Sequence, residues 1–359
     1  MKNRRIEFDI VKFMAIIFMS MIHSIECFEN DVSCGAGFFF DIITGGILAA
    51  PVFMLCMGFG FAYSRNTSRK YLIRRGIRTF ILGYALNIAR DIVPLIYYRA
   101  SRNTEMSLIY LSCLIEGDIL QFAGLAMMLT GLLQRFENPP VWALGIGIGL
   151  SLVHTFIPVI EFDGIFPSFL TGLFVYTECP MMEMCFPLFG WYIFVGAGYL
   201  LGSWLRKTAE PAPLYLKAGI PCFVLSVLYL IISRRNVYGM MGIEDYFYKM
   251  IFPDACASLG IFAGCIGLMY VLAGHIPQKT TSFIVRVSSC VNEIYIIHWI
   301  IMEWIVHVIV RRILGFSSDI YGAALIGILI LFAAVPLGFE YSKLKKRDKG
   351  STGVQKSCT

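Results

Sequence analysis

The chain has 359 residues, of which 57% are hydrophobic and only 15% are charged. A soluble domain of this length could not bury so much apolar surface, so the composition predicts an all-α polytopic membrane protein. The formal net charge of +6 is spread over short loops, and we therefore expect no nucleic acid as a partner. The eleven cysteines form no CxxC pair of the metal-binding type, and we expect no metal site.

Ten apolar stretches have lengths near the roughly twenty residues that a helix needs to cross a bilayer. In chain order, they cover residues 8–28, 37–63, 77–98, 118–133, 141–160, 186–205, 214–232, 251–273, 288–310 and 321–339. The first stretch begins with basic residues, as a signal peptide does, but it contains Asp9 and Lys12 and lacks a small-residue cleavage site. We therefore expect this segment to be retained as a membrane helix.

The lysines and arginines of the short loops gather on one side of the membrane if the N-terminus is cytoplasmic. The loop 64–78 carries Arg65, Arg69, Lys70, Arg74, Arg75 and Arg78. By the positive-inside rule, this asymmetry predicts about ten spans with both termini in the cytoplasm. We expect a transmembrane domain over residues 1–340 and a basic, disordered cytoplasmic tail over residues 341–359.

The first membrane segment holds several ionisable residues. On an α-helix, Arg5, Asp9, Lys12 and His23 lie close to one face. Ionisable groups inside a membrane helix are costly, so they face a protein interior or a wet cavity. Asp9 is an expected salt-bridge partner of Lys12 or Arg5, and Lys12 lies toward the inner side of the membrane.

His23 is expected in the outer third of this helix. A neutral histidine is the natural general base at neutral pH, so we predict that His23 is catalytic. The alternative is a histidine that caps a neighbouring helix or faces the outer interface.

Arg75 and Arg78 are spaced i, i+3 where the third segment begins. Two guanidinium groups on one helix face can hold phosphate groups through bidentate hydrogen bonds. The alternative is that these residues only set the topology, as basic residues of inner loops commonly do.

Further polar residues are expected inside the spans, toward their outer ends. They are Asp41, Asn87, Arg90, Asp118 and Gln121. Asp118 and Gln121 share a face at the start of an apolar run, so Asp118 either caps the helix or lines a cavity.

The ninth stretch places Asn292, Tyr295 and His298 at three-residue steps along one helix face. His298 is either a structural hydrogen-bonding residue or part of a site. Further along, Glu303 and His307 form an i, i+4 pair whose charges could neutralise each other.

Two cysteine pairs are expected at the outer face, Cys27 with Cys34 and Cys179 with Cys185. Disulfides are common on that side of a membrane, and the sequence leaves both pairs open. The outer loops 161–183 and 233–250 are longer than a connection requires, and such loops are often functional.

Several motifs together resemble the integral-membrane acyltransferase superfamily. One set of them is similar to its acyltransferase-3 family. Lys12 and His23 match a basic residue followed by ten residues and a histidine, and Arg75 with Arg78 match an R-x-x-R pair. The stretch 50–61 is similar to that family's Pro-x-Phe segment, and 294–298 is similar to its late Tyr-x-x-His helix. Lys12 stands where arginine is usual, and the proline common after the R-x-x-R pair is missing.

Other stretches look more like the branch related to heparan-α-glucosaminide N-acetyltransferase. They are 75–87, which reads RGIRTFILGYALN, 117–125, which reads GDILQFAGL, and the glycine-rich stretch 186–202. The two resemblances together span most of the first to fourth, the sixth and the ninth apolar stretches.

The resemblance implies an enzyme that takes an acyl group, expected to be acetyl, from cytoplasmic acetyl-CoA or another acyl-CoA. The acceptor is a hydroxyl or amine of an extracytoplasmic glycan, a lipid-linked sugar or a small molecule. His23 is the implied base, with Asp118 and His298 as further catalytic residues. Lys12, Arg75 and Arg78 are the implied acyl-CoA ligands, and Asp41, Gln121 and Tyr295 are assigned to the acceptor.

We expect a multi-pass protein of a bacterial plasma membrane, in contact with membrane lipid, and a homodimer is left open. Two other functions remain open at this point. The buried charges suit a transporter or flippase that relays a proton or substrate, and the same fold suits a non-catalytic membrane sensor. The acyl group, the acceptor and the choice between O- and N-acylation are left undecided.

Overall fold

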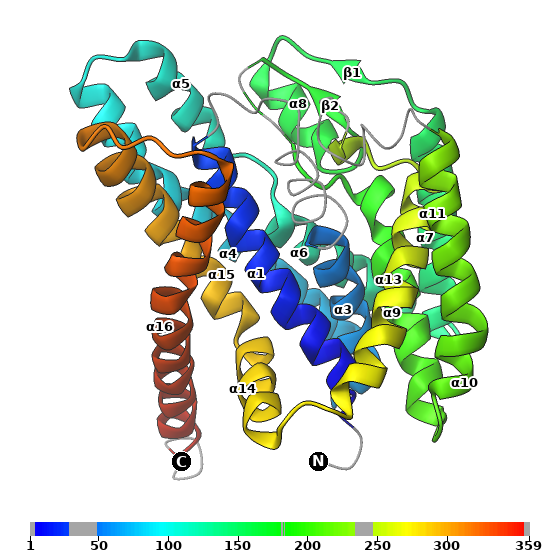
Figure 1. The fold of residues 1–359 in the computed structure, drawn as a ribbon. Coiled ribbons are helices and arrows are strands. Elements are labelled where there is room, and N and C mark those ends of the chain that lie inside the picture. Colours follow the sequence, from blue (N-terminus) through cyan, green and yellow to red (C-terminus); the bar gives the residue numbers. More distant parts are fainter. Residues whose placement is uncertain (1–3, 29–48, 181, 183, 234–246, 355–359) are drawn as a thin grey trace.

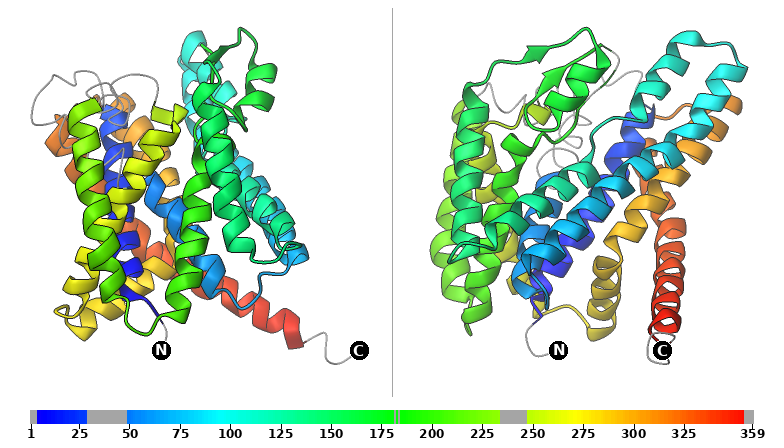
Figure 2. Two further views of the ribbon diagram at one scale, coloured as in Figure 1. Left: turned by 90° about the vertical axis from the view of Figure 1, so that its right-hand side faces the viewer. Right: turned by 180° about the vertical axis from the view of Figure 1, so that it is seen from behind.

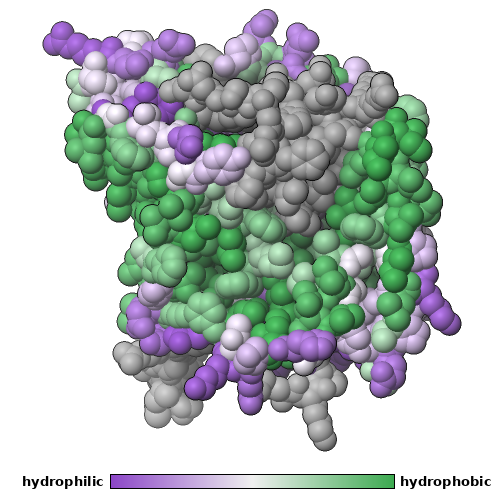
Figure 3. Space-filling model, viewed as in Figure 1, coloured by the Kyte–Doolittle hydropathy of each residue, from purple (hydrophilic) through white to green (hydrophobic). Residues whose placement is uncertain are grey.

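The computed structural model describes residues 4–28, 49–180, 182, 184–233 and 247–354 (Figure 1). Almost all regular structure in this part of the chain is helical, which confirms the predicted all-α polytopic membrane fold. Hydrophobic residues form a band across the face shown in Figure 3, with hydrophilic residues above and below it.

The first half of the chain forms helices of 8 to 32 residues. They are α1 (Ile6–Phe28), α3 (Ala50–Tyr63), α4 (Arg69–Ala100), α5 (Thr104–Cys113), α6 (Ile119–Leu133), α7 (Pro139–Phe156) and α8 (Ile165–Gly172). The second half contains α9 (Leu188–Lys207), α10 (Ala212–Leu214), α11 (Ile220–Ser233), α13 (Phe252–Ala273), α14 (Gln278–Ser289), α15 (Val291–Ile301) and α16 (Ile320–Val354). A short 3-10 helix, η3 (Phe247–Lys249), and two π-helical segments, η2 (Tyr215–Gly219) and η4 (Met302–Ile313), complete the helical elements.

Eight helical segments of the described chain are long and apolar enough to cross a membrane. They are Ile6–Phe28, Arg69–Ala100, Pro139–Phe156, Leu188–Lys207, Ala212–Ser233, Phe252–Ala273, Val291–Ile313 and Ile320–Lys345. The two remaining expected spans correspond to the shorter apolar helices α3 and α6. Both chain ends lie at the same end of the molecule in Figure 1. Helix α16 continues past residue 340, and the domain boundary at that residue stays a prediction.

Helix α1 passes through the middle of the bundle (Figure 1). It contacts α3, α13 and α14 toward its start, and α16 over its middle and later turns. On one side of α1, α3 and α9 pack with their backbones close together. A Cβ atom at Gly58 or Gly198 would collide with the facing backbone, so this close approach requires glycine at both positions.

A small cap covers the end of the molecule opposite the two termini (Figure 2). It consists of α8 and two short parallel strands, β1 (Ile160–Glu161) and β2 (Thr177–Glu178). His154 connects α7 to the cap, because its Nε2 accepts a hydrogen bond from the Tyr176 amide at 3.0 Å. The Nδ1 of the same ring donates to the Met250 carbonyl at 3.2 Å. This buried histidine therefore has both ring nitrogens in structural hydrogen bonds.

Candidate active site

Polar side chains from α1, α4 and α15 and from the start of α6 meet near the end of α1 that lies away from the N-terminus. We call this group the upper cluster. It consists of His23 and Glu26 of α1, Arg90 and Asp91 of α4, Glu116 and Asp118 before and at the start of α6, and Tyr295, His298 and Trp299 of α15. The elements come together because α4 packs along α6 and α15 packs along α16, which itself lies against α1.

His23 stands at the accessible side of the upper cluster. Its side chain is 22% exposed, and its Nδ1 lies 2.8 Å from Oε2 of Glu26. A carboxylate only accepts, so this contact assigns the hydrogen to Nδ1 and leaves the Nε2 lone pair available. A tilted ring contact with Trp299 and a stacked one with His298, at ring-centroid distances of 4.2 and 5.7 Å, hold the imidazole in place.

His298 is the buried partner of His23. Its side chain is fully buried, and its Nδ1 donates to the Tyr295 carbonyl at 2.5 Å. Its Nε2 is then a buried acceptor, and it has no hydrogen-bond partner among the described residues. Buried polar atoms are nearly always paired in native proteins, so an unpaired one next to a partly exposed histidine is a candidate contact for substrate.

Arg90 is the cation of the upper cluster, and three carboxylates surround it. Its guanidinium lies 3.0 Å from Asp91, 3.5 Å from Glu116 and 3.4 Å from Asp118. The same group also lies over the Trp299 ring, 4.7 Å from the centroid. Arg90 is 7% exposed, so a single buried cation holds together carboxylates from two parts of the chain.

Asp118 serves as a helix cap and as a member of the cluster at once. Its carboxylate accepts from the Ile119 amide at 2.6 Å, and Gln121 completes a capping box. The other carboxylate oxygen accepts from the Tyr295 hydroxyl at 2.7 Å. The predicted cap at Asp118 is confirmed, and the same carboxylate belongs to the upper cluster. Its role as a cavity-lining residue stays a prediction. The amide of Gln121 is committed to backbone groups of Asp118 and Glu116.

A second chain of buried polar groups lies beside the upper cluster. The Tyr110 hydroxyl is 3.3 Å from Glu303 and 3.1 Å from Nε2 of His307, which also meets the Tyr98 hydroxyl at 3.0 Å. Glu303 and His307 are thus linked through Tyr110 of α5, which the i, i+4 spacing alone does not indicate. Burial raises the pKa of Tyr110, so its hydroxyl remains protonated.

A separate group of charges surrounds the first turns of α1, and we call it the lower cluster. Asp9 is buried and lies 2.6 Å from Arg4 and 3.4 Å from Lys12. It also accepts from the Ser288 hydroxyl of α14 at 2.6 Å. The expected Asp9–Lys12 contact is present, but the second cation is Arg4 and not Arg5. Arg5 instead donates to two carbonyls at the end of α9.

Arg75 and Arg78 lie on the second and third turns of α4, far from His23. Both side chains are exposed, and neither makes an ion pair or hydrogen bond within the described part of the chain. Arg90 lies fifteen residues beyond Arg75 on the same helix, a rise of roughly 22 Å. The basic pair and the upper cluster are therefore at different depths of the bundle.

Asp41 and Cys34 lie outside the described residues. Cys179 and Cys185 are not joined by a disulfide, and the thiol of Cys185 lies 3.7 Å from Glu116. Over the described ranges, no group of three or more metal-ligating side chains is close enough to hold a metal ion.

The sequence did not point to Glu26 or Trp299. Glu26 stands three residues after His23, and i, i+3 residues are neighbours on a helix surface, so the spacing could have indicated this contact. Trp299 directly follows His298, but its contact with His23 joins helices that are distant in the sequence.

Comparison with known proteins gives one clear relationship. No curated protein and no solved structure matches the chain significantly. Residues 4–232 match the family model described as heparan-alpha-glucosaminide N-acetyltransferase, catalytic. The match includes α1, α4, α6 and α9, and thus the His23, Arg90 and Asp118 parts of the upper cluster. The resemblance to the acyltransferase-3 family stays a prediction. The chain therefore belongs to the heparan-alpha-glucosaminide N-acetyltransferase catalytic family.

Proposed function

We propose that the protein transfers an acetyl group from cytoplasmic acetyl-CoA to a hydroxyl or amine of a glycan on the other side of the membrane. Membership of the family supports the acetyltransferase class and the glycan acceptor. The observation that carries the proposal is the pair formed by partly exposed His23 and buried His298, whose Nε2 has no partner among the described residues. A structural histidine pair would be expected to have its polar atoms satisfied, as His154 has.

His23 acts as the general base in this proposal. Its Nδ1–H donates to Glu26, so Nε2 removes the proton from the acceptor O–H or N–H as the acceptor attacks the thioester carbon. The carbon–sulfur bond then breaks, and the CoA thiolate takes the proton from His23. The products are the acetylated acceptor and free CoA, and His23 returns to its neutral form.

His298 and Trp299 complete the reaction site. The free Nε2 of His298 accepts a hydrogen bond from a neighbouring hydroxyl of the acceptor, or from the second N–H of an amine, and orients the acceptor toward His23. The indole N–H of Trp299 is a buried donor without a hydrogen-bond partner in the described chain, and its ring contacts both histidines. Such a donor suits the negative charge that develops on the thioester oxygen.

Asp118 and Tyr295 position this site, because their hydrogen bond connects α6 to α15 next to His298. Gln121 supports the capping box that holds Asp118, so it acts on the acceptor only through Asp118. Asp41 remains a proposed acceptor ligand. The positive charge of Arg90 balances the negative charge of the surrounding carboxylates, which allows the cluster to be buried.

Lys12, Arg75 and Arg78 bind the acetyl-CoA in this proposal. Arg75 and Arg78 are exposed, and the start of α4 that carries them lies toward the end of the molecule with the chain termini (Figure 2), which we assign to the cytoplasm. Guanidinium groups without carboxylate partners are suited to phosphate. Lys12 lies between this end and His23 on the path that the acetyl-bearing arm would follow, and Asp9 holds its ammonium group.

The test is an assay of the purified full-length protein with labelled acetyl-CoA and a panel of glycans that carry free hydroxyl or amino groups. Mass spectrometry of the products should find the mass of one acetyl group added to an acceptor. His23→Ala should lower the rate by roughly 10²- to 10⁴-fold with unchanged thermal stability. Full activity in His23→Ala would refute the base assignment, and acceptor movement without acetylation would identify a transporter.

A further inference from the structure

The first turns of α4 form an open groove on the surface of the molecule. Its volume is about 550 Å³, and it is lined by Arg69, Lys70, Ile73, Arg74, Ile77 and Arg78. Four of these six residues are cations, and no carboxylate lines the groove. Within the described part of the chain, none of the four cations takes part in an ion pair.

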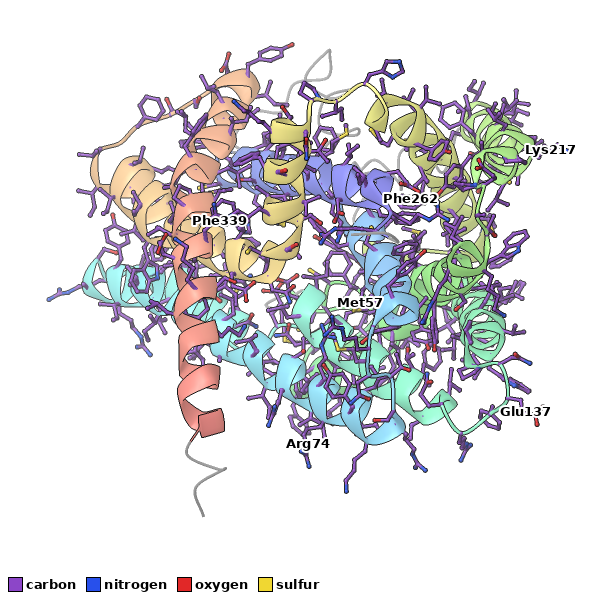
Figure 4. The ribbon with its side chains drawn as sticks, turned by 90° about the horizontal axis from the view of Figure 1, so that it is seen from below. Met57, Arg74, Glu137, Lys217, Phe262 and Phe339 are labelled. Carbon is purple, nitrogen blue, oxygen red and sulfur yellow. The ribbon has the colours of Figure 1, made fainter. Side chains whose placement is uncertain are left out.

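This groove faces away from the protein interior. The buried face of α4 is formed by residues such as Leu72, Gly76 and Asn87, and it packs against α6. At about 100° per residue, Lys70, Arg74 and Ile77 fall on the opposite face of the helix. Figure 4 shows Arg74 at the outer edge of the molecule, viewed from the end that carries the termini.

The same face of α4 continues as an apolar surface toward the other end of the helix. Ile81, Ile88 and Ile96 are 61%, 53% and 60% exposed, and all lie within a segment that is long and apolar enough to span a membrane. One helix face thus carries cations over its first turns and isoleucines over the turns that follow. Cations near a membrane surface attract anionic headgroups, and exposed isoleucines suit acyl chains.

We propose that this groove binds the headgroup of an anionic phospholipid, whose acyl chains lie along the exposed isoleucines of α4. The arginines hold the phosphate by paired N–H···O hydrogen bonds. A soluble phosphate compound would use the cations only, whereas a phospholipid uses both parts of the face. The proposal does not depend on acetyl transfer, although Arg78 belongs both to this groove and to the proposed acetyl-CoA site.

The experiment therefore leaves Arg78 intact. The triple variant Arg69→Gln, Lys70→Gln, Arg74→Gln removes three charges from the groove. The control Lys207→Gln, Lys217→Gln, Lys279→Gln removes three charges from exposed lysines elsewhere, and Figure 4 places Lys217 far from Arg74. Binding of phosphatidylglycerol and of phosphatidylcholine to each detergent-purified, full-length protein is measured by native mass spectrometry.

Wild type and control should bind phosphatidylglycerol more tightly than phosphatidylcholine. The groove variant should lose at least about tenfold in phosphatidylglycerol affinity, since each basic residue near the headgroup contributes severalfold. Ile77→Glu, at a position that is 46% exposed, places a carboxylate in the groove and should weaken phosphatidylglycerol binding selectively.

Three outcomes would overturn the proposal. Equal losses in the groove variant and the control would indicate a general effect of net charge. Displacement of phosphatidylglycerol by millimolar inorganic phosphate or free CoA would identify a site for soluble phosphates. Unchanged lipid preference in Ile77→Glu would show that the lipid binds elsewhere.

Discussion

The two ends of α1 carry polar clusters that differ in how completely their groups are satisfied. In the lower cluster, buried Asp9 has two cations and a serine hydroxyl as partners, all within 3.4 Å. In the upper cluster, Nε2 of His298 and the indole N–H of Trp299 are buried without described partners. The carboxylate of the lower cluster therefore has its partners within the protein, as expected of a structural network. The upper cluster has unpaired polar atoms that a substrate could contact.

The clusters also differ in how they are tied to the rest of the protein. The lower cluster joins α1 to α14 through one carboxylate. The upper cluster joins α1, α4, α6 and α15, and it depends on Arg90 to balance three carboxylates. Loss of Arg90 should consequently cost more stability than loss of a group of the lower cluster, whereas substitutions of His23 or Glu26 should act on kcat.

Arg90→Met should have the largest effect of the stability variants. It leaves Asp91, Glu116 and Asp118 without their shared cation, and removing one partner of a buried ion pair costs roughly 3–5 kcal/mol. The free energy of unfolding can be followed by denaturation with sodium dodecyl sulfate in mixed micelles. Arg90→Lys is the control and should recover part of the loss. A variant as stable as wild type would mean that the carboxylates are protonated or hydrated without Arg90.

Asp9→Ala should have a smaller effect on stability. It removes the partner of Arg4, Lys12 and Ser288, but Arg4 is partly exposed and can be hydrated. We expect a loss of about 2 kcal/mol in the same unfolding measurement. Because Lys12 is then no longer positioned, KM for acetyl-CoA should rise while kcat changes little. A fall in kcat with unchanged KM would place the lower cluster in the chemical step.

The fold and part of the site could be predicted from the sequence, because both follow from local rules. The length of each apolar run placed the membrane helices, and the Asp-x-x-Gln spacing gave the cap at Asp118. His23 and His298 were each identified by an ionisable side chain within an apolar helix. Their contact could not be predicted, since it depends on how α1 and α15 pack in three dimensions.

Local rules also failed where the backbone departs from a helix. Arg5 was placed on the face of Asp9 by assuming that the helix begins before it. Helix α1 begins at Ile6, so the preceding residues do not follow helical spacing. Arg4 reaches Asp9, and Arg5 turns toward the last carbonyls of α9. The partner of a buried carboxylate near a helix start therefore requires the three-dimensional structure.

Glu26→Gln tests the upper cluster through the orientation of His23. The amide presents a donor as well as an acceptor to Nδ1, so the tautomer with a free Nε2 is no longer enforced. Glu26 is 47% exposed, and water can partly replace it, so we expect a fall in kcat of only about tenfold. KM for both substrates and the thermal stability should stay unchanged. Glu293→Gln on α15 is a matched control, because its carboxylate binds Lys345 away from the cluster, and it should leave kcat unaltered.

Ser288→Ala should have the smallest effect and separates the two clusters most cleanly. The variant removes one hydroxyl that donates to Asp9, while Arg4 and Lys12 continue to satisfy the carboxylate. The expected loss is about 1 kcal/mol of unfolding free energy, as for one buried hydrogen bond to a charged group that keeps its other partners. Acetyl transfer should be unchanged in kcat, because the hydroxyl lies in the lower cluster. Combining Ser288→Ala with Glu26→Gln should give additive effects if the clusters are independent. A coupled loss larger than about 0.5 kcal/mol would instead mean that α1 transmits strain between its two ends.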